Sequence, residues 1–540
     1  MKSLFRKAHL YYHTLRHLKF RQLFGRLWAE FKRRRGLFSL PEPPSLLTGR
    51  LAPKAGFPHH CPWNTSEGLR EGRFTFLNVT RALGQWPDWH PEGMPLLWLF
   101  NLHYFKYLHL LKPEEQEELC LHWISNNPVG EGVGWHPYPL SLRVASWCKA
   151  QPTDPAINKS IYQQAQYLYR NTEFFHPGNH YLENAKALVF AGAFLAGQGE
   201  ADQWLQKGLK ILQKEIPDQV LEDGGYFERS TTYHALMLEL LTDVLNIIEE
   251  DSEAWHLIET SVQKMADFLL SLTHPDGTIT LFNDSTEEIA PSTASLLRYV
   301  SEVTGYAAQH KTSFPDSGYF VMRSEHFYLA IDAGPLGPDY LLAHAHADLF
   351  TYELSVNGER TIVDTGVFEY PAGELRSLCR STTAHNCPTV DDVDQAECWS
   401  SFRVARRFKP CSVRFLTEDS ETVLSCRFDG YSQLIGDNLS VTREVRMGCD
   451  RQIVVTDTFE GEGAHRLATR IHLHPSIVVQ RDGKSRVRLP GKVSLTGSAP
   501  LQVGEAPFFP RFGMSRSRSV ITLREERTLP AVLTYTIDLH

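Results

Sequence analysis

The spacing of the apolar residues changes once along this chain, near residue 310. Before that point apolar side chains recur at helical intervals, as at Leu236, Leu240 and Val244, where steps of four residues keep one face buried. After it the period shortens to two, as in residues 327–331, which indicates strands. The sequence therefore predicts a helical domain followed by an antiparallel β domain.

This change of period divides the chain into four expected parts. They are a basic aromatic N-terminal segment at 1–36, a connector rich in proline and glycine at 37–74, a helical domain at 75–312 and a β-sandwich domain at 313–540. Serial helical hairpins stack as a bundle, a solenoid or a toroid, and periodicity alone does not distinguish these. Within the β domain, Asn357-Gly358 predicts a hairpin turn, and 476–480 is expected to form another strand.

Charge is distributed unevenly along the chain. The net charge is −8, yet residues 1–35 hold eleven Lys and Arg and one Glu, a local balance of +10 that leaves −18 for the rest. This balance argues against a protein that binds nucleic acid through its overall charge. The N-terminal segment either lies on an anionic membrane surface or packs its apolar face on the main body with its charges in solvent, and we favour the second arrangement.

Cysteine usage and the N-terminus suggest a compartment. The nine cysteines show no CxxC spacing and no disulfide framework, as expected in a reducing environment. The first residues do not develop the uninterrupted apolar region of a signal peptide, and no apolar run of about 18 residues occurs. We expect a cytoplasmic protein, with peripheral membrane contact through residues 1–35 left open.

A short run in the β domain, Ala-His-Ala-His-Ala-Asp at 343–348, concentrates groups that could do chemistry. On a strand, His344, His346 and Asp348 would share one face and could bind a metal, move protons, or both. With Asp364 and His385 downstream, two His and one carboxylate would suit a divalent ion. The alternative is a row of hydrogen-bonded histidines on a strand.

The helical domain holds a second group of polar residues. Asn179, His180 and Glu183 follow a Pro-Gly loop at a predicted helix start, where Asn179 could equally be a helix N-cap. Tyr233 lies in the first turn of a later helix, after a Glu228-Arg229 pair that could be a simple ion pair.

Two further stretches admit either function or packing. The segment 135–143 contains His136, Tyr138 and Arg143, and resembles either the wall of a cleft or an interface between helices. Asn283-Asp284 is most simply a turn.

An ordered series of motifs resembles the heparinase II/III-like family of polysaccharide lyases, which includes alginate and oligoalginate lyases. The motifs are Asn179-His180-x-x-Glu183, Gly225-Tyr226-x-Glu228-x-Ser230-x-x-Tyr233-His234, His344-x-His346-x-Asp348, Asp364-x-Gly366 and His385-Asn386. The resemblance spans roughly residues 75–460. It implies an N-terminal incomplete (α/α) toroid followed by a C-terminal antiparallel β-sandwich.

The resemblance also implies a reaction, β-elimination at a uronic acid. Asn179 and His180 would face the uronate carboxylate, Tyr233 would act as acid and for one C5 epimer as base, and His344 would be the base for the other epimer. Glu183 would assist.

A metal and a substrate surface are implied in the same way. His346, Asp364 and His385 would hold a structural divalent ion, most simply zinc, with Asp348 behind them. The expected substrate-binding residues are Glu183, His136, Tyr138, Arg143, Arg229, Tyr370, Arg376 and Arg380. The spacing of Tyr370 does not fit the family pattern cleanly, which leaves the assignment of the base open.

The expected function is therefore a lyase that cleaves an anionic, uronate-containing polysaccharide or oligosaccharide. The competing hypothesis is a non-catalytic or accessory glycan-binding protein of bacterial surface-polysaccharide assembly. A paired-carboxylate hydrolase is disfavoured, because the motif positions are mostly His, Asn and Tyr. Sequence does not identify the polymer.

Overall fold

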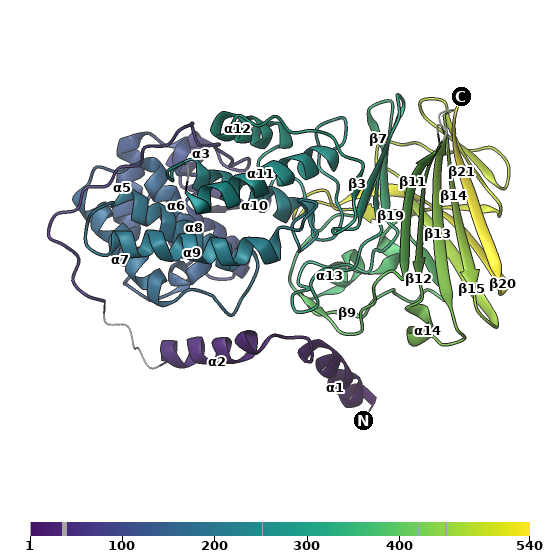
Figure 1. Cartoon of the computed structure of the whole chain (residues 1–540), viewed down its shortest axis with the longest axis horizontal. Helices are drawn as coiled ribbons and strands as arrows, with labels where there is room; N and C mark the ends of the chain where they lie inside the picture. Colours follow the sequence, from purple (N-terminus) through teal and green to yellow (C-terminus); the bar gives the residue numbers. More distant parts are fainter. Residues whose placement is uncertain (1, 35–39, 251, 419–420, 449–450) are drawn as a thin grey trace.

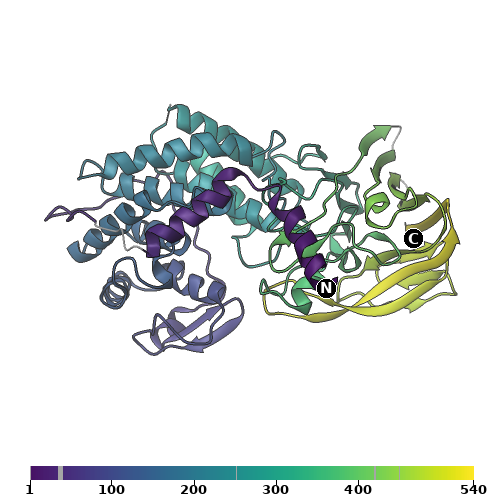
Figure 2. The same ribbon diagram turned by 90° about the horizontal axis from the view of Figure 1, so that it is seen from below.

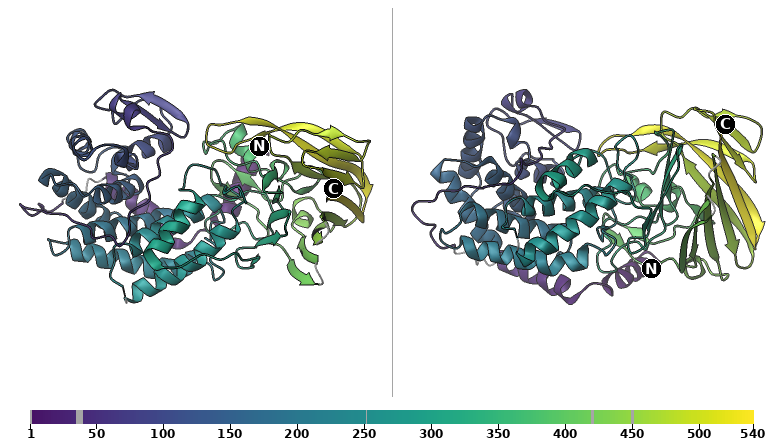
Figure 3. Two further views of the ribbon diagram at one scale, coloured as in Figure 1. Left: turned by 90° about the horizontal axis from the view of Figure 1, so that it is seen from above. Right: turned by 45° about the horizontal axis from the view of Figure 1, so that its top comes forward.

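Helices and strands occupy separate halves of the molecule. The computed structural model describes residues 2–34, 40–250, 252–418, 421–448 and 451–540. The helical part and the β part lie end to end along the long axis (Figures 1 and 3). The last long helix ends at Thr304 and the first strand of the β part begins at Ser313. Residues 35–39, where the expected connector begins, lie outside the described residues.

The helical part is built from an inner and an outer set of helices. Its helices are α3 (Ser66–Arg70), α4 (Leu96–Tyr104), α5 (Pro113–Asn126), α6 (Pro137–Ala150), α7 (Pro155–Arg170), α8 (Asn179–Phe194), α9 (Ala201–Gln219), α10 (Thr231–Leu245), α11 (Glu253–Ser271) and α12 (Thr293–Thr304). Helices α4, α6, α8, α10 and α12 contact one another in that order, whereas α5 contacts α7 and α9 contacts α11. This alternation is the pattern of an incomplete (α/α) toroid.

Burial follows the same division. Nearly every residue of the inner helices α8 and α10 is buried, whereas α5 buries only Leu119, Cys120 and Trp123. Because an outer helix returns the chain between successive inner helices, α6, α8 and α10 all begin at the same end of the toroid. That end is where the predicted residues Tyr138, Asn179 and Tyr233 lie.

Three antiparallel sheets make up most of the β part. The five-stranded sheet holds β3 (Ser313–Phe314), β4 (Tyr319–Arg323), β5 (Phe327–Asp332), β6 (Tyr352–Val356) and β7 (Glu359–Ile362) in sequential order. The four-stranded sheet has the order β19 (Leu501–Phe508), β20 (Arg516–Thr528), β15 (Ala464–His472) and β8 (Pro388–Val390). The eight-stranded sheet has the order β11 (Ser412–Glu418), β12 (Glu421–Phe428), β13 (Ser440–Gly448), β14 (Gln452–Glu460), β21 (Ala531–Leu539), β18 (Val493–Gly497), β17 (Arg486–Leu489) and β16 (Gln480–Arg481).

Apolar side chains of the three sheets share one core. Leu329 of β5, Val455 of β14 and Ile521 of β20 are fully buried members of the same cluster. Sheets that bury their inner faces against each other form a sandwich. The predicted fold class, a toroid followed by a β-sandwich, is therefore confirmed. Smaller elements are the hairpins β1 (Arg73–Phe76) with β2 (Val79–Ala82) and β9 (Cys398–Trp399) with β10 (Arg403–Val404), and the short helices α13 (Glu374–Cys379) and α14 (Tyr431–Leu434).

Local predictions in the β part had mixed outcomes. Asn357 and Gly358 have φ of 52° and 86° and connect β6 to β7, which confirms the predicted hairpin. Residues 476–479 are not a strand, so that prediction was wrong, since pairing begins only at Gln480 in β16. His344, His346 and Asp348 also do not share a strand, because residues 341–348 form a loop between β5 and β6.

The N-terminal segment forms two helices, α1 (Lys2–Leu15) and α2 (Phe20–Arg34), which lie across one side of the molecule (Figures 1 and 2). Their apolar residues are largely exposed, including Phe5, Tyr12, Phe20, Phe24 and Leu27. The favoured arrangement, with the apolar face packed on the main body, is therefore wrong. Within the described ranges, no helix combines the length and apolar character needed to cross a membrane. The cysteines that the structure describes are free thiols.

Candidate active site

Three inner helices bring polar side chains to the end of the toroid that faces the β-sandwich. Tyr138 lies in the first turn of α6, Asn179 and His180 begin α8, and Tyr233 lies in the first turn of α10. His180 stacks on Tyr138 with ring centroids 4.1 Å apart, and the amide of Asn179 lies 3.5 Å from the Tyr138 hydroxyl. These residues form one connected group.

The start of α8 is shaped around Glu228. Gly178 is the N-cap residue, with φ of 99°, and a Cβ placed there would lie 2.2 Å from the Glu228 Oε1 atom. Asn179 is therefore the first helical residue and not the N-cap, which leaves its side chain free to reach Tyr138. The N-terminus of a helix carries a partial positive charge, so this end of α8 favours an anion.

His180 is oriented by Glu173. Its Nδ1 atom lies 3.3 Å from Oε2 of Glu173. Burial alone would raise the pKa of Glu173, but His180 and further polar neighbours lower it, so this carboxylate accepts a proton-bearing Nδ1. The half-exposed His180 ring is thereby fixed with Nε2 away from Glu173.

Tyr233 connects the toroid to the β part. The side chain of Ser230 caps α10 by accepting a hydrogen bond from the backbone N–H of Tyr233. The Tyr233 ring stacks on His344 with a centroid distance of 3.8 Å, and its hydroxyl lies 3.1 Å from that of Tyr370. Burial and the neighbouring Tyr370 raise the pKa of Tyr233 well above its usual value, so its hydroxyl keeps its proton.

Asp284 organises the histidines on the β side. Its Oδ2 atom accepts a hydrogen bond from Nδ1 of His344 at 3.0 Å, and its Oδ1 atom accepts one from Nε2 of His346 at 2.8 Å. Arg376 donates to both carboxylate oxygens. Burial alone would raise the pKa of Asp284, but Arg376 and the two histidines hold it well below its usual range. An ionised Asp284 only accepts, so His344 carries its proton on Nδ1.

The other nitrogen of His344 is consequently a lone-pair acceptor when the ring is neutral. It lies 3.4 Å from Oε2 of Glu228. Burial raises the pKa of Glu228. Glu228 and Arg229 do not form the ion pair that their sequence position allows, because Arg229 turns away and donates to the carbonyl of Asp316.

A cluster suited to a metal ion lies directly behind His344. One ligand atom each from His346, Asp348 and His385 lies within 4.8 Å of the others, and all three residues are buried. Nδ1 of His346 and Nε2 of His385 are buried without a hydrogen-bond partner. Asp284 accepts from the other nitrogen of His346, and Asp364 from Nδ1 of His385 at 2.9 Å, so each unpartnered nitrogen carries a lone pair when its ring is neutral. Burial alone would lower the pKa of His385, but Asp364 raises it, so a cation bound there would displace a proton.

These contacts fit a divalent cation but change the expected ligand set. Asp364 was predicted to be a ligand, with Asp348 behind it, whereas the cluster favours the opposite arrangement. Asp364 orients His385, while Asp348 lies in the cluster itself. Burial disfavours the ionised form of Asp348 and raises its pKa to about 6. A bound cation would stabilise the ionised carboxylate.

Four arginines expected to bind substrate are instead engaged with protein groups. Arg143 is fully buried and donates to Gln164 and to the carbonyl of Gly134. Arg380 is buried and donates to the carbonyl of Ala345. Arg376 is occupied by Asp284, and Arg229 by a carbonyl. The prediction that these four line a substrate surface was wrong, because each guanidinium is buried and donates to protein oxygens.

The remaining predicted residues are placed in or near the site. Glu183 pairs with Lys186 at 3.0 Å one turn inside α8. His136 is the N-cap residue of α6, and its ring packs against Phe100. Tyr370 joins the site through Tyr233.

Asp284, Glu228 and Glu173 are the residues whose roles the sequence did not reveal. The motifs contain more histidines than carboxylates, and this was the one sign in the sequence that other carboxylates orient these histidines. Asp284 lies 60 residues from His344, and Glu173 lies in the loop before the helix that carries His180.

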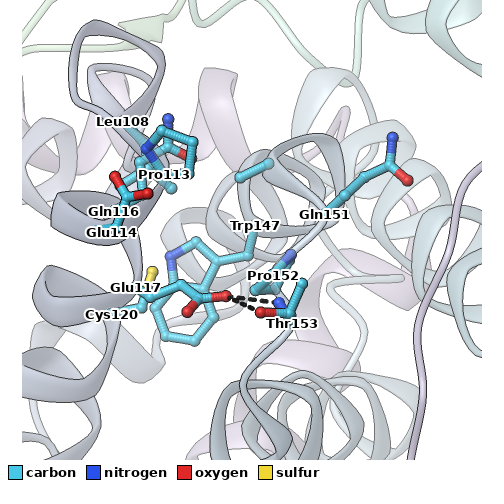
Figure 4. Close-up of a pocket in the computed structure, with 11 residues that line it drawn as sticks. Leu108, Pro113, Glu114, Gln116, Glu117, Cys120, Trp147, Gln151, Pro152 and Thr153 are labelled. Carbon is cyan, nitrogen blue, oxygen red and sulfur yellow. Dashed lines mark hydrogen bonds between the residues drawn. The ribbon is translucent and has the colours of Figure 1, made fainter.

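A separate pocket of about 240 Å³ lies at the far side of the toroid, between α5 and the end of α6 (Figure 4). Its lining includes Glu117, which accepts hydrogen bonds from the backbone and hydroxyl of Thr153, and Trp147. It contains none of the site residues described above.

Two family models match this chain. One, described as "Heparinase II/III N-terminus", matches residues 156–312, and the other, "Heparinase II/III-like, C-terminal", matches residues 307–531. The chain is 27% identical over 316 residues to a heparin-sulfate lyase of Pedobacter heparinus, covering 50% of this chain and 47% of that protein. A heparin-sulfate lyase of Bacteroides thetaiotaomicron is 25% identical over 331 residues, covering 51% and 47%. The match thus spans about half the length of these curated relatives.

Solved structures share the fold over a larger part of the chain. The crystal structure of heparan sulfate lyase from Pedobacter heparinus has a TM-score of 0.59 at 20% identity, covering 88% of this chain and 82% of that one. A crystal structure of heparinase III has a TM-score of 0.67 at 17% identity, covering 95% and 89%. Both consecutive family matches and the shared fold lead to one conclusion: this chain belongs to the heparinase II/III-like family.

Proposed function

We propose that this protein is a polysaccharide lyase that cleaves a uronate-containing anionic glycan of the glycosaminoglycan type by β-elimination. The curated relatives are named as lyases of heparin sulfate, which supports this substrate class. The single observation that carries the proposal is the stacked pair of Tyr233 and His344, whose rings come from different domains and lie 3.8 Å apart.

The reaction requires three things of a site. The C5 proton is not acidic while the adjacent carboxylate keeps its full charge, so that charge must be stabilised, a base must remove the proton, and an acid must protonate the leaving O4. The N-terminus of α8 meets the first need, because Asn179 and the oriented His180 lie where the helix favours an anion.

The protonation states support one choice for the other two roles. His344 holds its proton on Nδ1 against Asp284, so its Nε2 atom is the base that takes the C5 proton. Tyr233 keeps its phenolic proton, because burial and Tyr370 raise its pKa, and it donates that proton to O4. The C5–H electrons form the C4–C5 double bond as the C4–O bond breaks. A second role of Tyr233 as base for the opposite epimer is disfavoured by the same shift.

We further propose that the cluster of His346, Asp348 and His385 holds a structural zinc ion. Two neutral imidazoles and a carboxylate suit zinc, and the two unpartnered nitrogens support its presence. A bound ion would fix the loop 341–348 and thereby the position of His344. Asp284 links the two centres, since it binds both His344 and His346.

The test is ultraviolet absorbance of the unsaturated uronate product, measured with a panel of uronate polymers and oligomers. We expect absorbance to rise with the unchanged protein and not with Tyr233→Phe or His344→Ala. His256→Ala, on the exposed side of α11, is the matched control and should retain full activity. Folded protein that binds a polymer without forming product would favour the glycan-binding alternative and overturn the proposal.

A further inference from the structure

Helix α2 presents its apolar residues to solvent. Phe20, Leu23, Phe24 and Leu27 follow a helical spacing of three and four residues and are 71, 42, 56 and 68% exposed. They form one continuous row along the helix, which we call the outer row. A helix on a globular protein normally buries such a row.

The opposite side of α2 holds the helix to the body through polar and small residues. Arg21 pairs with Glu215 of α9 at 3.0 Å, and Gln22 donates to the carbonyl of Tyr340 at 2.9 Å. Gly25 is buried so closely that a Cβ there would lie 2.4 Å from Cβ of Phe175. The orientation of α2 is therefore specified by contacts, and the outer row faces away from the protein because of them.

Helix α1 repeats this arrangement. Phe5, Tyr12 and Leu15 are 71, 64 and 46% exposed. On the inner side Thr14 accepts a hydrogen bond from the indole of Trp399 at 3.1 Å, and His9 lies 3.2 Å from Glu397. Seen from below, both helices lie in front of the toroid and the β part, on one side of the molecule (Figure 2).

The charges beside these residues are positive. Arg6, Lys7, Arg16 and Arg26 are exposed and flank the apolar side chains of α1 and α2. Residues 1–35 carry +10 in total, whereas the rest of the chain carries −18. Aromatic and leucine side chains bordered by Arg and Lys are the composition of helices that lie in the headgroup region of an anionic bilayer.

We propose that α1 and α2 form an interfacial anchor that binds the surface of a bilayer containing anionic phospholipids. Phe5, Tyr12, Phe20, Phe24 and Leu27 enter the interface, and the flanking basic residues contact phosphate headgroups. A second copy of the chain fits less well, because a symmetric contact would bring two segments of +10 together. This inference does not depend on the lyase proposal, since none of the anchor residues belongs to the site.

The experiment is flotation of the full-length protein with lipid vesicles. One vesicle contains only phosphatidylcholine, and the other contains equal parts of phosphatidylcholine and phosphatidylglycerol. We expect binding to the mixed vesicles, weakened by salt, and little binding to phosphatidylcholine alone. Phe20→Ser/Leu27→Ser should lower the partition coefficient by roughly tenfold or more, because two large apolar side chains no longer enter the interface.

Two controls keep the result specific. Leu416→Ser/Val478→Ser removes two equally exposed apolar side chains from the β part, at 55 and 67% exposure, and should bind as the unchanged protein does. Arg6→Gln/Arg26→Gln should weaken binding to the mixed vesicles while circular dichroism stays unchanged. The proposal is overturned if the unchanged protein does not float with mixed vesicles, if Phe20→Ser/Leu27→Ser binds equally well, or if sedimentation shows instead a dimer that this variant abolishes.

Discussion

Replacing Asp284 with Asn changes the site more than its nearly equal size suggests. Asp284 accepts on Oδ1 from His346 and Arg376, and on Oδ2 from His344 and Arg376. An amide has one acceptor oxygen, so its NH2 group must face Arg376 and one of the two histidines. If it faces His344, the proton of that ring moves to Nε2 and the base is lost. If it faces His346, that ring loses the lone pair it offers to a metal.

The expected losses are large in both activity and stability. An Asp→Asn change that reverses the tautomer of a catalytic histidine lowers kcat by about 10⁴ in the serine-protease triad, and we expect an effect of about 10³–10⁴ here. Arg376 is fully buried and would lose its charged partner, which costs about 3–5 kcal/mol of folding stability.

Activity and stability can be separated with a matched control. Asp457→Asn removes a buried carboxylate that Arg443 binds with two hydrogen bonds of 2.7 Å, but no histidine of the site depends on it. Product absorbance gives kcat, and chemical denaturation gives the free energy of unfolding. Both variants should lose similar stability, and only Asp284→Asn should lose activity in the folded protein. A kcat for folded Asp284→Asn within about tenfold of the Asp457→Asn value would refute the assigned role of Asp284.

Three further predictions follow from the same contacts. Removing the metal with a chelator should lower Tm, and elemental analysis should find one zinc released per chain. His385→Ala should abolish zinc retention. An unchanged Tm and no bound metal would contradict the site. Burial lowers the pKa of His234 to about 4, so the folded protein keeps this ring neutral. The unfolded chain takes up a proton there below its pKa of about 6.5. The free energy of unfolding should therefore fall by about 3 kcal/mol as the pH drops from 6.5 to 4. Denaturation of His234→Gln across that range should show a shallower decline, and an unchanged slope would refute the assignment. Gly178→Ala should cost roughly 1–3 kcal/mol and lower kcat, because a Cβ there meets the Glu228 carboxyl and φ is 99°; wild-type Tm and kcat would show that α8 can shift without effect.

The order of helices and strands was predictable because periodicity is a local property. Steps of four residues in α10 and the Asn357-Gly358 turn depend on neighbours in sequence, and the structure confirms both. The gathering of Tyr233 with His344 was expected only from the resemblance to a family, since nothing local brings the two domains together.

The parts that failed depend on contacts between distant residues. Sequence cannot distinguish a carboxylate that orients a histidine from one that binds a metal, and the contacts of Asp364 with His385 and of Asp348 with the cluster become visible only in three dimensions. Asp284 looked like a turn residue because its partners lie at least 60 positions away. The prediction for the arginines failed because sequence does not show burial: Arg143 is fully buried and donates to Gln164 and to the carbonyl of Gly134, out of reach of a substrate.

The common starting end of α6, α8 and α10 bears on how enzymes of this shape could diversify. These three inner helices contribute their first turns to the same edge, and packed helices are spaced by roughly 8–10 Å. Duplicating one inner and outer helix at the open N-terminal side of the toroid would therefore lengthen the row of binding positions by one step, without moving Tyr233 or its partner across the domain junction. For the proposed lyase, the number of helical hairpins would therefore set the length of glycan chain that this edge can engage.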